Sequence, residues 1–293
     1  MDKDLKVIEE ESENIEAQKT SKKGKKTVLI VLMSLVLVVA VVCLVFIVPD
    51  FKVKVQTNDD VNSKPQATDT VSSETIDPNF EFIDSSLYGG ITLKAYTGDD
   101  SEVVIPATYN GQPVTVIGSS AFKGKPNLKS VVIPDTVTTI GIEAFMYCDA
   151  LTSINLPKSL TNINERAFYY CKGLTNLTFP EGLEVIGAEA FSKCSHLESL
   201  TFYKGLIKIS EDAFLFCKGL TSVDLPEGLR HIGNSAFSNC NALTSITIPK
   251  SVITIEEYAL SSCDSLKEIR AYHSLDYYNN PQIPLYCEWV VID

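Results

Sequence analysis

The residues that most often carry out enzyme chemistry are scarce in this sequence. Its 293 residues include only three histidines, His196, His231 and His273, and none lies beside a carboxylate or cysteine constellation. There is no Cys-x-x-Cys pair, glycine-rich phosphate loop or metal-ligand spacing. Basic residues are also in deficit, 25 against 37 acidic ones, for a net charge of −12. We therefore expect no catalysis, no metal and no cofactor, and electrostatic repulsion argues against nucleic acid as a partner.

Charge is absent from one long apolar run, Val28–Val48, which only Ser34 interrupts. The run has about the 20 residues that a membrane-spanning helix needs. Five lysines lie within residues 19–26 and only Lys52 and Lys54 follow closely, so the positive-inside rule predicts a single-pass protein of the cell membrane with a cytoplasmic N-terminus. The alternative is a cleaved signal peptide. Its apolar region is about 7–15 residues long, and the greater length of this run favours an uncleaved anchor.

Composition and patterning divide the chain into six parts. Residues 1–26 hold seven acidic residues and seven lysines, so the net charge belongs to the rest of the chain. The segment after the apolar run is rich in Thr, Ser, Asn and Asp and has little to bury, which predicts a flexible spacer. The predicted parts are a cytoplasmic tail (1–26), a transmembrane helix (27–49), a disordered spacer (50–79), a β-rich N-terminal cap (80–117), a repeat solenoid (118–272) and a C-terminal cap (273–293).

The solenoid is predicted from a gapless internal repeat. An Ala-Phe pair recurs every 23 residues, and Ala259-Leu260 forms a seventh, altered copy. A fixed period of this length is typical of stacked supersecondary units, each of which buries the apolar face of its neighbour. The pairs begin at Ala121, Ala144, Ala167, Ala190, Ala213 and Ala236.

Each repeat contains two short apolar segments and one compact turn. Residues 151–156 alternate as a strand that Pro157 ends, because proline cannot donate to a ladder. Residues 160–163 form a second inward-facing segment. Ala167, Phe168 and Cys171 would share one face of a short helix. We therefore expect an α/β repeat fold with stacked parallel strands about 4.8 Å apart and a short helix in each coil.

The repeated phrase at residues 222–243, SVDLPEGLRHIGNSAFSNCNAL, resembles the BspA-type leucine-rich repeat. The leader from Gly89-Gly90 through Val104-Ile105-Pro106 to Gly111-Gln112-Pro113 resembles the usual start of such an array. The resemblance covers about residues 85 to 272. It implies a bacterial or protist surface protein with adhesion or protein binding as its role, and it supplies no catalytic or ligand residues.

Six of the eight cysteines occupy one repeat position, three residues after the inward Phe or Leu260. Stacked neighbours would lie near 5 Å apart, close enough for adjacent pairs to form disulfides if the rotamers allow. The simpler interpretation is a buried column of reduced thiols that fills the core, and a metal site is the third alternative. The six residues are Cys148, Cys171, Cys194, Cys217, Cys240 and Cys263.

The two positions after each Ala-Phe pair vary most between coils. Several copies carry small polar residues there, such as Ser238-Asn239, whereas three carry large apolar or aromatic ones. Exposed clusters of such side chains tend to mark contact sites, although partial burial against neighbouring coils would explain them equally. The hydroxyl-rich outward strand positions form a second candidate surface. The candidate partner-binding residues are Met146, Tyr147, Tyr169, Tyr170, Leu215 and Phe216.

Together these features predict a membrane-anchored extracellular repeat protein that is not an enzyme. It would bind a protein or glycan partner outside the cell, and cell-surface adhesion is the first hypothesis. The alternative is an envelope scaffold or sensor that binds other proteins of the same membrane. The 26-residue tail is too short to be a folded signalling domain, which weakens the sensor version.

Overall fold

The computed structural model describes residues 77–85, 89–271 and 288–291. The chain divides into two compact units, residues 1–71 and 72–293, and all described residues belong to the second. The predicted tail, the predicted transmembrane helix and most of the predicted spacer lie outside the described residues. Within the described ranges there is no helix of the length and apolar character needed to cross a membrane.

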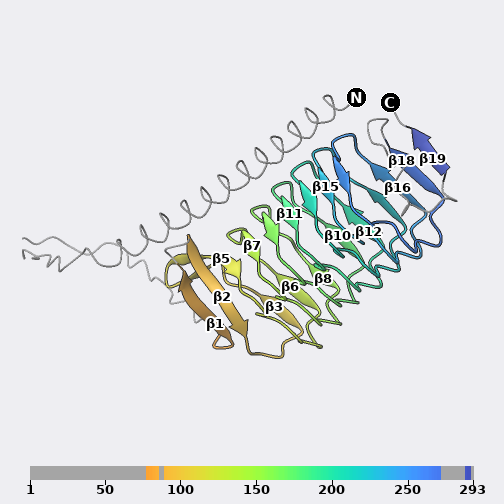
Figure 1. Ribbon diagram of the computed structural model, residues 1–293. Helices are drawn as coiled ribbons and strands as arrows, with labels where there is room; N and C mark the ends of the chain where they lie inside the picture. The colour runs from red at the N-terminus through yellow and green to blue at the C-terminus, as the bar shows by residue number, and fades with distance from the viewer. Residues whose placement is uncertain (1–76, 86–88, 272–287, 292–293) are drawn as a thin grey trace, which may run out of the picture. The chain divides into compact units, whose positions relative to one another are not determined.

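The second unit is a row of stacked coils, and one side of every coil contributes to a continuous sheet (Figure 1). From β2 onward the path is parallel, and residues of equal repeat position pair, for example Ile140 with Ile163. β1 adds to β2 in antiparallel fashion at one edge, and β4 pairs with β5. The strands are β1 (Phe80–Ser85), β2 (Gly90–Tyr96), β4 (Thr108–Tyr109), β5 (Gln112–Ile117), β7 (Thr139–Ile140), β9 (Asn162–Ile163), β11 (Val185–Ile186), β13 (Lys208–Ile209), β15 (His231–Ile232) and β17 (Thr254–Ile255).

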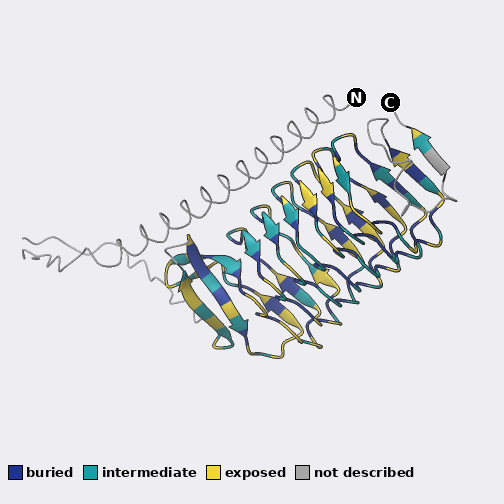
Figure 2. Ribbon diagram, viewed as in Figure 1, coloured by how far each residue is buried: buried dark blue, intermediate teal, exposed yellow. Residues whose placement is uncertain are grey.

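A second side of the coils carries the strand predicted before each Pro, here divided among three parallel sheets. Inward positions stay in register between coils, as in the pairs Leu177–Leu200 and Ile246–Ile269, and buried and exposed positions alternate along these strands (Figure 2). The sheets are β3 (Glu102–Val104), β6 (Ser130–Val132) and β8 (Ser153–Ile154); β10 (Asn176–Thr178) and β12 (Ser199–Thr201); and β14 (Ser222–Asp224), β16 (Ser245–Ile248), β18 (Glu268–Ala271) and β19 (Glu288–Val291).

The third side of each coil corrects the expectation of short helices. No helix occurs among the described residues, and the Ala-Phe segments are successive turns. In the coil of Phe145, Ala144 and Met146 donate backbone hydrogen bonds to residues three positions back, whereas the Phe145 and Tyr147 amides donate to Ala167 and Tyr169 of the next coil. Every second amide is thus used between coils. An α-helix would need all of them within the segment, so the inter-coil ladder replaces the helix.

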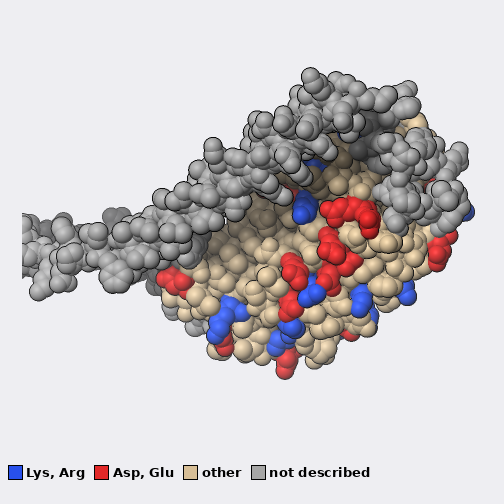
Figure 3. All heavy atoms as spheres, in the orientation of Figure 1, with Lys and Arg blue, Asp and Glu red and all other residues tan. Residues whose placement is uncertain are grey.

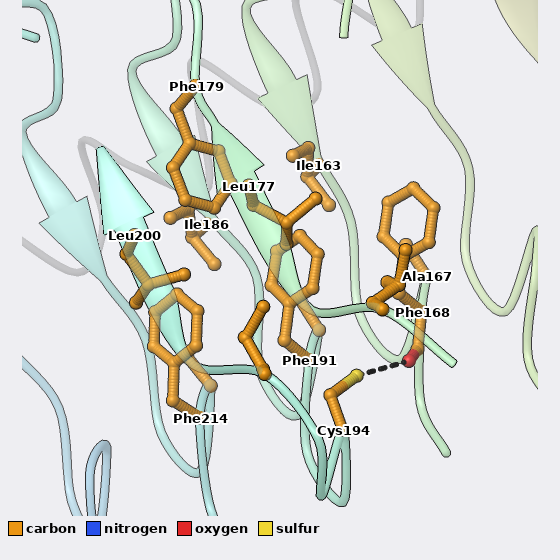
Figure 4. Close-up of a cluster of buried hydrophobic side chains, with 14 of the residues drawn as sticks. Ile163, Ala167, Phe168, Leu177, Phe179, Ile186, Phe191, Cys194, Leu200 and Phe214 are labelled. Atoms are coloured by element: carbon orange, nitrogen blue, oxygen red, sulfur yellow. Dashed lines mark hydrogen bonds between the residues drawn. The ribbon is translucent and has the colours of Figure 1, made fainter. Parts of the chain in front are cut away.

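The core consists of columns of identical residues. The Phe rings of the Ala-Phe pairs stack nearly parallel, with centroids 4.9–5.4 Å apart from Phe122 to Phe237. Figure 4 shows Phe168, Phe191 and Phe214 in this stack beside the inward residues of both strand sides. Because every coil adds the same side chains at the same height, the apolar core runs through the described solenoid without interruption.

The cysteine column lies beside the Phe stack, and all six residues are fully buried free thiols. Each Sγ donates to the carbonyl of a Phe 26 residues earlier, at 3.0–3.4 Å, as Cys194 does to Phe168 in Figure 4. The interpretation of the column as core filling is confirmed. Its location is a turn, where a helix face was expected.

Candidate functional site

The candidate site begins with an unusual backbone requirement in the Ala-Phe turns. The second residue after each Phe has a positive φ, and in three coils this residue is aromatic: Tyr147 (61°), Tyr170 (66°) and Phe216 (61°). Glycine and asparagine adopt this conformation at little cost, and they occupy the same position as Gly124 and Asn239. A bulky side chain here is held at a conformational cost of about 1 kcal/mol or more.

Three of the predicted residues form one aromatic cluster across two neighbouring coils. The Tyr147 ring meets Tyr169 and Tyr170 edge-on, with centroids 5.7 and 5.5 Å apart, and the Tyr169 and Tyr170 rings are 6.2 Å apart. Tyr147 is 43% exposed, and the other two are half-buried. The cluster therefore presents aromatic surface to the solvent in a fixed edge-to-face geometry.

Met146 does not belong to this exposed cluster, which corrects the sequence prediction. The first position after the Phe is buried in three coils, as Met146, Ser192 and Ser238, and half-buried in the coil of Tyr169. Leu215 and Phe216 are half-buried two coils beyond Tyr170. The prediction of partner binding at the six residues stays a prediction, and the structure brings Tyr147, Tyr169 and Tyr170 into contact.

Lysines surround the aromatic residues on the same side of the coils. The Lys172 ammonium lies over the Tyr170 ring, 4.1 Å from its centroid, and 3.5 Å from the Asp149 carboxylate. Lys193 donates to the Tyr169 hydroxyl at 2.6 Å. These contacts raise the pKa of both lysines, through Tyr170 for Lys172 and through Tyr169 for Lys193, and so favour their charged forms.

Three successive coils line an open hollow of about 450 Å³ beside the aromatic cluster. Tyr170, Lys193 and Phe216 occupy one repeat position in these coils, and Lys172, Ser195 and Lys218 occupy the position two residues later. Lys218 lies over Phe216 with its ammonium 5.9 Å from the ring centroid, the same two-residue arrangement as Lys172 and Tyr170. The hollow lies between Lys172 and Lys218, because the residue between them in the stack, Ser195, has a small side chain.

Sequence reasoning placed Tyr170 and Phe216 in the site but missed the lysines. The missed signal was a lysine two residues after an aromatic residue, present as Tyr170/Lys172 and Phe216/Lys218. This lysine signal could be recognised only with the knowledge that the turn places residues two apart on the same side of the coil. In a helix, residues two apart point to different sides.

Other surfaces offer less. A second hollow of about 450 Å³ is lined by Leu156, Lys158, Thr178, Phe179, Pro180, Glu181 and Tyr203, and its two charged groups have opposite signs. On the face shown in Figure 3, acidic and basic groups are interspersed, with acidic groups gathered near its centre. Among the described residues, no group of three or more His, Cys, Asp or Glu side chains could hold a metal ion.

The stacked parallel coils, the column core and a side-chain site on variable turn positions define a leucine-rich-repeat solenoid. A model of the BspA type leucine-rich repeat region matches residues 115–242 and 196–281, in six copies. The chain belongs to this family, which typically provides non-enzymatic binding scaffolds.

Several solved bacterial structures resemble the chain. A leucine-rich cell surface protein from Faecalibacterium prausnitzii A2-165 is 27% identical over 71% of this chain and 71% of its own, with a TM-score of 0.50. The T. pallidum leucine-rich repeat protein TpLRR is 28% identical over 65% of this chain and 78% of its own, with a TM-score of 0.49. A leucine-rich repeat protein from Bacteroides capillosus ATCC 29799 is 33% identical over 42% and 93%, with a TM-score of 0.38. No match was found among curated proteins.

Proposed function

We propose that this protein is anchored in the cell membrane through Val28–Val48 and displays its solenoid outside the cell, where it binds a protein partner in surface adhesion. The uncharged run and the lysines before it support the anchor and its orientation. The similar F. prausnitzii structure is named as a cell surface protein, which agrees with this location. Leucine-rich repeat proteins generally bind proteins, so a protein partner takes precedence over a glycan.

The observation that carries the binding role is the aromatic cluster of Tyr147, Tyr169 and Tyr170. Tyrosine is enriched among residues that dominate binding energy, because it offers a large and rigid contact area with a polar tip. Two of the three tyrosines occupy a backbone conformation that disfavours them. The same conformation recurs at Lys193 and Asn239 in other coils, so the fold imposes it, and the exposed aromatic surface of the cluster is what supports the binding role.

A partner-capture assay tests the binding role. The full chain, solubilised in a mild detergent, is immobilised and offered extracellular-matrix proteins of a host and, separately, envelope proteins of the source organism. The variant Tyr147→Asn/Tyr170→Asn should lose capture at least tenfold, since two central aromatic contacts are each worth about 1–2 kcal/mol. Another coil has an asparagine, Asn239, at the equivalent turn position with a similar positive φ, so the backbone should accept the change.

The matched control is Tyr203→Ser, which removes an exposed tyrosine outside the cluster. Equal loss in the control and the cluster variant would refute the assignment of binding to the cluster. Capture of envelope proteins alone would replace adhesion by the envelope-scaffold alternative.

Protease treatment of intact cells tests the location. A tag on the N-terminus should be protected, whereas an epitope within the solenoid should be lost. Protection of both, with digestion only after lysis, would contradict an extracellular solenoid.

A further inference from the structure

The hollow beside the aromatic cluster has a composition at odds with the protein as a whole. The chain carries a net charge of −12, yet Lys172, Lys193 and Lys218 line this hollow and no acidic residue does. Among the described residues, no carboxylate lies within 4.0 Å of the Lys193 or Lys218 ammonium. The hollow is thus a small positive site in an acidic molecule.

The three ammonium groups are held in place before any ligand arrives. Lys172 and Lys218 each rest on the aromatic ring two residues earlier, and Lys193 is hydrogen-bonded to Tyr169. Fixing a long side chain on binding costs entropy, so groups already positioned bind more tightly than free ones. Both side chains of the ion pair between Lys172 and Asp149 are exposed to solvent, so the pair contributes little stabilising free energy. It does not prevent this lysine from contacting a second anion.

The size and neighbours of the hollow indicate the kind of anion. About 450 Å³ lies within the range of pockets that hold drug-sized ligands, so an acidic side chain can enter together with neighbouring atoms of a peptide, and the Ser195 hydroxyl adds a hydrogen-bond donor among the lysines. A long polyanion would be repelled by the acidic remainder of the molecule. A short anionic group with apolar neighbours fits better, because Tyr170 belongs both to the hollow and to the tyrosine cluster.

We propose that the hollow binds the carboxylate side chain of an acidic segment in the protein partner, with Lys172, Lys193 and Lys218 as the cationic contacts. This inference rests on the proposed function and specifies the kind of segment that the protein recognises. The partner segment carries Asp or Glu beside residues that cover the tyrosines. Rim charges of this kind contribute chiefly to selectivity and association rate.

Equilibrium binding of labelled peptides tests the inference. The full chain in detergent is titrated with a short fluorescent peptide that carries two Glu flanked by Ser, and with its counterpart in which Gln replaces both Glu. The wild type should bind the acidic peptide more tightly, and the preference should fall as salt is added. Lys172→Gln/Lys193→Gln/Lys218→Gln should weaken acidic-peptide binding about tenfold, as expected for the loss of three exposed charge contacts.

The matched control is Lys158→Gln/Lys204→Gln/Lys208→Gln, which removes the same charge from exposed positions elsewhere and should change binding less than about twofold. Equal losses in the two variants, or no preference for the acidic peptide, would overturn the proposal. Binding of 3′-sialyllactose that depends on the three site lysines, without peptide binding, would instead make the hollow an anionic-glycan site.

The two proposals can fail separately. Tyr147→Asn leaves every residue of the hollow in place, so it should reduce partner capture and retain acidic-peptide binding. Partner capture by a wild type that does not distinguish the two peptides would refute the carboxylate site and leave the proposed function intact. Peptide binding without any partner capture would refute the proposed function.

Discussion

Single residues in the cysteine column are both buried and hydrogen-bonded, as most buried polar groups are. Each side chain is fully buried, and each thiol still makes a hydrogen bond, to the carbonyl of a Phe on an earlier coil. Burial raises the pKa of the Cys148 thiol to about 11 and that of Cys194 to about 12. Because the thiolate is the reactive form, these cysteines are inert structural side chains at neutral pH.

The raised thiol pKa values predict a loss of stability at high pH. Between pH 9.0 and about 12, Cys194 is protonated in the folded state and ionised in the unfolded state. The unfolded state then binds fewer protons, so the free energy of unfolding falls as pH rises, by about 1.4 kcal/mol per pH unit for each such thiol. The free energy of unfolding, measured by urea at a series of pH values above 9.0, should fall less steeply with pH in Cys194→Ala than in the wild type, by that amount per pH unit. Parallel wild-type and variant curves would contradict the shifted pKa.

The unsatisfied hydroxyl of Ser192 predicts that replacing this residue with alanine stabilises the protein. Its hydroxyl is fully buried and is without a hydrogen-bond partner in the described structure, whereas Ser238 at the same repeat position accepts a hydrogen bond from Asn239 at 2.9 Å. An unsatisfied buried hydroxyl costs about 1–3 kcal/mol. Ser192→Ala should therefore raise the free energy of unfolding by about 1 kcal/mol, and Ser238→Ala should not. Thermal unfolding of both variants measures the difference, and equal shifts would refute this explanation.

At the scale of the repeat elements, the strands were predictable and the turns were not. The alternation in residues 151–156 and the stop at Pro157 located β8, and the apolar pair at 160 and 163 located β9. The Ala-Phe segment has helix-like spacing in the sequence, but two residues with positive φ, Glu143 and Tyr147, flank its centre. Their conformation is set by hydrogen bonds to the next coil, which local sequence patterns do not record.

The close approach of the preceding coil makes Gly187 sensitive to substitution, although Asn164 and Ser210 occupy the equivalent position in other coils. A Cβ on Gly187 would lie 2.6 Å from the Asn164 carbonyl carbon and 2.8 Å from the Glu165 nitrogen, both backbone atoms. Gly187→Ala should therefore push two coils apart and cost about 1–3 kcal/mol. Gly182→Ala is the control, since its Cβ would stand 3.2 Å from the nearest atom, the Lys158 carbonyl oxygen. Similar urea midpoints for the two variants would show that the coils yield easily.

Across the whole described solenoid, stability and recognition depend on different residues of the same turn. The inward Ala, Phe and Cys recur in nearly every coil and could be read from the 23-residue period. The candidate site depends on departures from the repeat, namely tyrosines at 147 and 170 and lysines that follow aromatic residues. Sequence predicted the aromatic part of the site because those departures are conspicuous. The lysines were missed because their positions relative to the rings follow from the three-dimensional turn.

The continuous Phe stack predicts how the solenoid unfolds. Phe191 lies 5.0 Å from the Phe168 ring and 5.4 Å from the Phe214 ring, so its removal weakens both coil interfaces at once. Phe191→Ala should lower the free energy of unfolding by about 3–5 kcal/mol. Phe191→Leu, which introduces the residue found at the equivalent Leu260, should lose less. In a stack where each coil contacts only its neighbours, uniform coupling keeps unfolding cooperative. Urea unfolding should therefore show one transition with an unchanged slope, and a second transition in Phe191→Ala would mean that the coils on either side unfold separately.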